Sequence, residues 1–117
     1  GPVPGRLALD VVWIKRDGSP MTDEDWQIGG QLVLGKLIHG RATDEIDERG
    51  RPMHGETVLL MVNGGAGPVR FKLPALDEPG VWEELINTAR QHVRTVVSAD
   101  AVNLAAHALM LLIHKRP

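Results

Sequence analysis

Short apolar runs separated by turn-forming residues dominate this chain, and the pattern indicates a β-rich domain. The run 9–14 is rich in β-branched and aromatic residues and is followed by Asp17-Gly18, a dipeptide typical of tight turns. The run 32–38 predicts a second strand, and Gly35 within it indicates a bulge or a close backbone approach. The first third of the chain therefore predicts two strands.

Two further strands follow a polar stretch. Residues 41–56 are charged and turn-rich, which is typical of a solvated loop or hairpin tip. The run 57–62 is apolar without alternation, so it predicts a central strand covered on both faces. Residues 69–73 alternate strictly, which predicts that Val69, Phe71 and Leu73 face the core before Pro74 ends the strand.

One short helix is expected near residues 22–27. Thr22 can cap the free backbone amides at its start, and Asp25 lies near the positive end of the helix dipole. Gly29-Gly30 leaves room for no more than a short helix.

The last third of the chain supports two interpretations. Apolar residues recur at helical spacing from Trp82 to Val93, and residues 99–113 tolerate a helix by intrinsic propensity. However, four of the five residues in 93–97 are β-branched, and 109–113 can form a short buried strand. Periodicity alone predicts an α+β fold, whereas the β-branched residues favour strands, and both interpretations stay open.

Composition narrows the function classes. The 117 residues include 13 basic and 15 acidic side chains, a formal net charge of -2, without the clustered Lys and Arg that nucleic-acid binding requires. No apolar run is long enough to span a membrane. The chain has no cysteine, which excludes disulfides and thiolate sites and makes the cytoplasm the expected compartment. We therefore expect no nucleic-acid partner and no membrane.

The candidate chemistry is sparse. The acidic clusters 23–25 and 44–48 do not have the spacing of a calcium loop, and the five histidines, at positions 39, 54, 92, 107 and 114, lack tight metal-ligand spacing. The glycine-rich stretch 64–67 lacks the Lys-Ser/Thr of a phosphate loop and predicts a turn. We expect no metal, no cofactor and no catalytic residue in this chain.

Taken together and in order, several pieces of the chain resemble the C-terminal domain of bacterial glycogen debranching enzymes, in the isoamylase branch of the α-amylase superfamily. The pieces that carry the resemblance are Asp10 to Trp13 with Asp17-Gly18, Met21 to Trp26, Gly35 to Gly40, Asp44 to Pro52, Thr57 to Asn63, Phe71 to Pro74, and Trp82 through Leu85 to Ala89. The chain departs from the family at Asn63-Gly64-Gly65, where Asn-Ala-His is common, and at Asn87, where Asp is usual.

The resemblance implies a Greek-key antiparallel β-sandwich, which favours strands for residues 82–86 and for the final apolar run. It also implies that the domain packs against an upstream (β/α)₈ barrel of the same polypeptide, an enzyme that hydrolyses α-1,6-glucosidic branch points of glycogen or limit dextrin. The catalytic carboxylates belong to that barrel, which needs about 250 residues. Residues 3–117 are then one non-catalytic C-terminal domain, and Gly1-Pro2 is interpreted as the remnant of a cleaved expression tag.

The three tryptophans are the main candidates for contact with a glucan. Sugars stack on exposed indole rings, but with three Trp, one Phe and no Tyr the core needs the same side chains. We expect core or interdomain packing for Trp13 and Trp82, and exposure and carbohydrate contact for Trp26. Two alternatives stay open: an independent module that binds glycogen or maltooligosaccharide, and a self-standing interaction domain.

Overall fold

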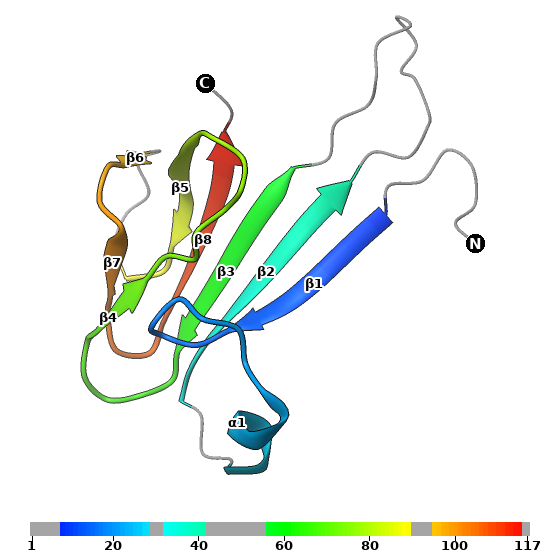
Figure 1. Cartoon of the computed structure of the whole chain (residues 1–117). Coiled ribbons are helices and arrows are strands. Elements are labelled where there is room, and N and C mark those ends of the chain that lie inside the picture. The colour runs from blue at the N-terminus through cyan, green and yellow to red at the C-terminus, as the bar shows by residue number, and fades with distance from the viewer. Residues whose placement is uncertain (1–7, 29–31, 42–55, 90–94, 116–117) are drawn as a thin grey trace, which may run out of the picture.

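The computed structural model describes residues 8–28, 32–41, 56–89 and 95–115, which form strands and one short helix (Figure 1). The elements are β1 (Ala8–Ile14), α1 (Asp23–Ile28), β2 (Val33–Arg41), β3 (Thr57–Asn63), β4 (Val69–Lys72), β5 (Val81–Asn87), β6 (Thr95–Val97), β7 (Ala101–Leu104) and β8 (Ala108–Lys115). The predicted all-β fold with one short helix is confirmed. The expectations for Gly1-Pro2 and for the body of the charged loop, including residues 44–48, lie outside the described residues.

The strands form two antiparallel sheets of unequal size. The larger sheet has the order β1-β2-β3-β8-β5-β6, and β4 pairs with β7 in a two-stranded sheet. β8 returns to lie beside β5 after the chain has passed through β6 and β7, which is a Greek-key connection. The two-stranded sheet lies over only part of the large sheet, and β1 and β2 extend away from it (Figure 1).

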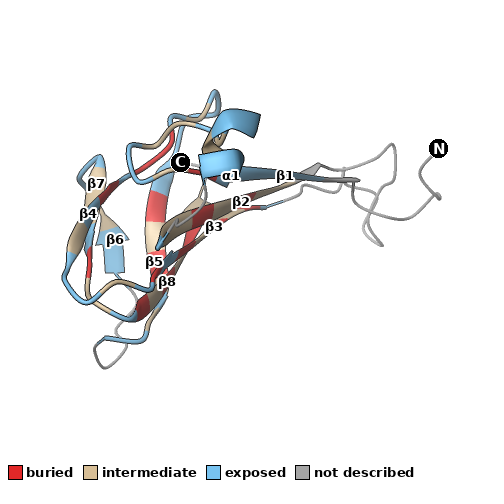
Figure 2. Ribbon diagram, turned by 90° about the horizontal axis from the view of Figure 1, so that it is seen from below, coloured by how far each residue is buried: buried red, intermediate tan, exposed pale blue. Residues whose placement is uncertain are grey.

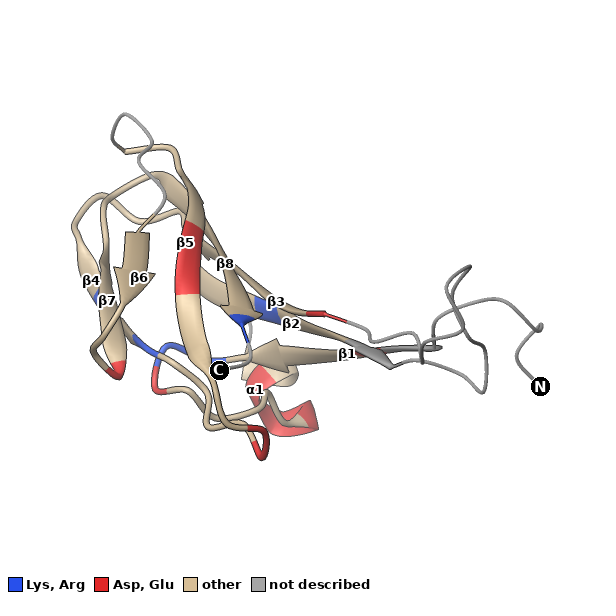
Figure 3. Cartoon of the chain, turned by 90° about the horizontal axis from the view of Figure 1, so that it is seen from above, with Lys and Arg blue, Asp and Glu red and all other residues tan. Residues whose placement is uncertain are grey.

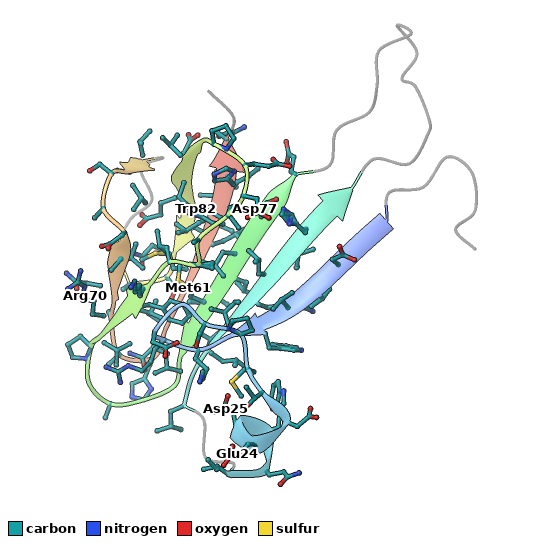
Figure 4. All side chains as sticks on the ribbon, viewed as in Figure 1. Glu24, Asp25, Met61, Arg70, Asp77 and Trp82 are labelled. Atoms are coloured by element: carbon teal, nitrogen blue, oxygen red, sulfur yellow. The ribbon has the colours of Figure 1, made fainter. Side chains whose placement is uncertain are left out.

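The core fills the space between the two sheets. It is formed by Ile14, Leu37, Leu59, Met61, Phe71, Leu73, Trp82, Leu104, Ala108, Met110 and Leu112. Figure 4 shows Met61 and Trp82 inside the sandwich and Arg70 on its outside. The predicted inward positions of 69–73 are therefore confirmed, because Phe71 and Leu73 are buried and Val69 packs against the core.

β3 is central in the large sheet, as its apolar sequence predicted, but in the described structure only one of its faces is covered. Thr57, Leu59, Met61 and Asn63 are buried towards the second sheet. The alternate side chains of the range 58–62 are half-buried or exposed. The prediction of two covered faces was therefore wrong for the part of the chain that the structure describes.

The helical spacing between positions 82 and 86 has a physical cause in a strand. β5 pairs with β8 throughout, but its register shifts between Glu84 and Ile86. A β-bulge adds one residue and breaks the period of two, so the apolar positions no longer alternate. The strand interpretation, which the family resemblance favoured, is confirmed for this segment.

The start of α1 has the predicted cap. The backbone amide of Asp25 donates to Oγ1 of Thr22 at 3.1 Å, and the Thr22 amide donates to Oδ2 of Asp25 at 2.8 Å. These reciprocal bonds form a capping box. The Thr22 amide and the Thr22 hydroxyl both donate to Oδ2 of Asp25 and lower the pKa of this carboxyl, with a smaller contribution from the ammonium of Lys15 at 3.3 Å.

His114 near the end of β8 makes the stability of the fold depend on pH. Its ring contacts Trp82 at a centroid distance of 5.1 Å, and partial burial lowers its pKa, an effect that Glu78 opposes and His39 reinforces. A histidine with a lowered pKa takes up its proton more readily in the unfolded chain than in the folded one. His114 therefore does not reduce the free energy of unfolding above pH 6.5, and it reduces that free energy as the pH drops below this value.

We expect the variant His114→Gln to show a smaller loss of stability between pH 7 and pH 5 than the parent chain, measured by urea unfolding. His107→Asn is the matched control, because His107 lies in a turn with a φ of 53°, a conformation that asparagine tolerates. An unchanged pH dependence in His114→Gln would contradict this origin.

Candidate functional site

The face of the large sheet that points away from β4 and β7 is a candidate interaction surface. In each strand of this sheet, the residues that alternate with the core residues point to this side. We call this set of residues the outer face. It consists of Val11, Trp13, Leu34, Lys36, Ile38, Val58, Leu60, Val62, Val81, Glu83, Ile86, Val96, Leu109, Leu111, Ile113 and Lys115.

The outer face is apolar where an antiparallel sheet normally presents polar side chains to water. Three of its members are charged, Lys36, Glu83 and Lys115, and the rest are apolar. Val11 is 47% exposed and Val62 41%, although neighbouring side chains in a sheet shield one another. Sheets with one solvated face usually alternate apolar and polar residues, and a contiguous apolar patch marks a site of interaction.

The second layer of the sandwich covers β1 and β2 only at one end, where Ile14, Gly35 and Leu37 are buried. Figure 2 shows β4 and β7 grouped over one end of the large sheet, with β1 and β2 projecting beyond them. Consistent with this, Val12, on the core side of β1, is 37% exposed, and β1 is an edge strand. Among the described residues, this part of the sheet has apolar side chains accessible on both faces.

Two tryptophans meet at the β1 edge. Trp13 and Trp26 pack edge to face, with ring centroids 5.7 Å apart and planes at 88°. Trp26 is 45% exposed, as the sequence predicted, and Trp13 is 38% exposed and thus outside the core. Trp82 is buried in the core, which confirms that part of the expectation. Because the two rings are perpendicular, they do not form one flat platform for a sugar.

Lys36 contacts Trp13 at the same edge of the sheet. Its Nζ lies 5.3 Å from the centroid of the Trp13 ring, within the range of a cation–π contact. Lys36 and Trp13 are direct cross-strand partners, so the contact follows from the register of β1 and β2. Figure 3 shows acidic residues on α1 and β5, and further ones in the loops.

The acidic residues 23–25 lie in the first turn of α1, where negative charge stabilises a helix. Asp25 accepts the capping bonds from Thr22 and pairs with Lys15. In the described part of the chain, no group of three or more His, Cys, Asp or Glu side chains is placed to hold a metal ion. His54 and His92 lie outside that part. No helix of the described residues is long and apolar enough to cross a membrane.

Described residues line grooves at two places along the edges of the sandwich. One, of about 540 Å³, is bordered by the β1–α1 loop, the start of β2 and the turn after β3, with Lys15, Arg16 and Asp17 on its polar side. The Asp17 carboxylate accepts bonds from the hydroxyl and amide of Ser19, which lower its pKa. The other, of about 430 Å³, lies between β5 and β7 and includes the buried Glu84.

The turn after β3 is held by the side chain of Asn63. Nδ2 of Asn63 donates to the carbonyls of Gly67, Leu104 and Ala105, and its Oδ1 accepts from the amide of Gly65. The side chain is 1% exposed. Asn63 is therefore a structural residue that joins the β3–β4 and β7–β8 connections.

Sequence reasoning did not identify the outer face as a surface. Its signal is the lack of alternation in the run 57–62, which predicts a strand covered on both faces. The signal is real, because Val58, Leu60 and Val62 do form a second apolar row. The covering layer is absent among the described residues, so the row is a candidate interface.

Comparison with known proteins gives a relative for almost the whole chain. No family model matches. The chain is 26% identical over 111 residues to the glycogen operon protein GlgX homologs of Mycobacterium tuberculosis and Mycobacterium bovis. The match spans 92% of this chain and 15% of the length of those relatives. The resemblance to bacterial glycogen debranching enzymes that the sequence indicated is thus supported by a relative that is a glycogen operon protein and is far longer than this chain.

Proposed function

We propose that residues 3–117 are the C-terminal accessory domain of a cytoplasmic glycogen debranching enzyme that hydrolyses α-1,6-glucosidic branch linkages. In this proposal the domain is non-catalytic, and the acid/base and nucleophilic carboxylates lie in an upstream (β/α)₈ barrel. The role of the domain is to pack against that barrel through the outer face and so to stabilise and position it.

The apolar outer face is the observation that carries this proposal. Exposing a contiguous apolar face to water is unfavourable in free energy, and packing that face against another domain removes this unfavourable contribution. The relatives of this chain are several times longer, so the domain that packs against the outer face can belong to the same polypeptide. Val62 and Ile86, both more than 40% exposed, are expected to be covered in the longer protein.

Side-chain footprinting with hydroxyl radicals tests this proposal directly. The 117-residue chain and the full product of its gene are oxidised in parallel, and modified residues are identified by mass spectrometry. We expect Trp13 and other outer-face residues to react in the short chain and to be protected in the full-length protein. Trp26 gives a second reading at the β1 edge, and the buried Trp82 is an internal reference that reacts slowly in both.

The size and activity of the native protein complete the test. An antibody against this domain should detect a polypeptide several times heavier than 12.8 kDa, and that protein should release linear chains from branched glucans. A native polypeptide near 12.8 kDa, or unprotected outer-face residues in a longer one, would rule out the docking proposal.

A second candidate function is glucan contact at Trp26, which its 45% exposure favours. A sugar stacking on this indole would change its fluorescence during titration with maltohexaose. Trp26→Ala should abolish the change, whereas Val96→Ala, at an exposed position on β6, should preserve it. An emission spectrum that does not respond to maltohexaose would exclude Trp26 as a glucan site.

A further inference from the structure

Lys36 is a single positive charge within an apolar part of the outer face. The register places Trp13 of β1 and Leu60 of β3 directly across from it. Leu34 and Ile38 precede and follow it on the same face of β2. Lys36 therefore has an apolar neighbour in each of the four directions along and across the strands.

The described residues give Lys36 no carboxylate partner. Its contact is with the Trp13 ring, at 5.3 Å from Nζ to the centroid, and Lys15, the nearby lysine at the end of β1, already pairs with Asp25. Lys36 is half-buried even without a partner domain. Its ammonium is solvated only because the outer face is open to water.

Covering the outer face would remove that water. An ammonium buried without a countercharge is strongly unfavourable, and a cation–π contact offsets part of the loss of hydration. A lysine at the margin of an interface can extend its stem to reach water, but Lys36 is held over the Trp13 ring and surrounded by apolar residues. The remaining way to bury it is to pair it with an anion.

We infer that the surface that docks on the outer face presents a carboxylate to Lys36 from within an apolar surround. This inference rests on the proposed function, and it places that carboxylate in the same polypeptide, outside residues 1–117. A single buried charge pair in an otherwise apolar contact fixes the orientation of the two surfaces, because a rotated or shifted docking leaves both charges unpaired.

Zero-length cross-linking of the full-length protein tests the contact. A water-soluble carbodiimide activates a carboxylate, and an amine in contact then forms an amide bond to it, with the net loss of one water. We expect Lys36 to be joined to an Asp or Glu outside this domain. Lys72, exposed on β4 on the other side of the sandwich, is the control and should give no such product.

Substitutions at position 36 give an independent measurement. Lys36→Met keeps the stem and removes the charge, so the footprint of the outer face should stay protected in the full-length protein. Lys36→Glu would oppose two carboxylates and should return outer-face oxidation to the rates of the short chain. Lys72→Glu changes the net charge equally and should leave the protection unchanged.

The outcomes separate the inference from the proposed function. If the unaltered full-length protein shows no protection of the outer face, the docking proposal itself fails. If the outer face is protected but Lys36 gives no cross-link and Lys36→Glu retains the protection, docking holds and the carboxylate inference is wrong. Should Lys36→Glu not fold as a short chain, the cross-link of the unaltered protein decides alone.

Discussion

Replacing Asn63 with alanine is expected to lower the free energy of unfolding by about 3 kcal/mol, the loss of a buried, fully hydrogen-bonded amide. Three carbonyls, those of Gly67, Leu104 and Ala105, lose their donor, and the amide of Gly65 loses its acceptor. Urea unfolding at pH 7 measures the change, which for a domain of this size corresponds to a drop in Tm of roughly 10 °C.

Two comparisons make the Asn63 prediction specific. Asn103→Ala removes an exposed amide on β7 and should change stability by no more than about 0.5 kcal/mol. Asn63→Asp keeps the acceptor for Gly65 but turns a carboxylate oxygen towards three carbonyl oxygens, so it should be at least as destabilising as Asn63→Ala. A loss similar to that of Asn103→Ala would show that the amide network contributes little.

Most strands could be predicted because their signals are local. β1 and β4 follow from runs of strand-forming residues closed by Asp17-Gly18 and by Pro74, and the cap of α1 follows from Thr22 and Asp25, three positions apart. These signals depend on sequence neighbours alone. β5 could not be assigned in this way, because its bulge imitates helical spacing, and the bulge exists only through its pairing with β8.

The sequence predicts that the candidate interface is apolar, but it does not predict which face of the sheet forms it. An apolar strand without alternation must be desolvated on both faces, yet the same pattern results whether the second cover is the chain itself or another domain. Only the strand order shows that β4 and β7 cover one face of β3. Likewise, the isolation of Lys36 depends on its register with Trp13 and Leu60, which are distant in sequence.

Gly35→Val is the second substitution with a large expected effect, and its sign opposes strand propensity. Valine is favoured in strands and glycine is not, so propensity alone predicts a gain in stability. However, a Cβ at position 35 would lie 2.8 Å from Cζ of Phe71, which is fully buried in the core. β2 pairs on both sides of Gly35 without a register shift, so there is no bulge, and the atom nearest to the added Cβ belongs to a side chain rather than to the backbone. We expect overpacking to cost about 3 kcal/mol in urea unfolding.

The cause can be isolated by a double substitution. If the ring of Phe71 is the obstacle, then Gly35→Val combined with Phe71→Leu should be less destabilising than the sum of the two single changes, because leucine leaves room for the new methyl groups. Gly67→Ala is the control, since a Cβ there meets no atom within 4 Å and should have little effect. Additive losses, or a gain in stability from Gly35→Val, would contradict this explanation. Either result would show that the two sheets can move apart at Gly35, so that the contact that determines how they pack lies elsewhere in the core.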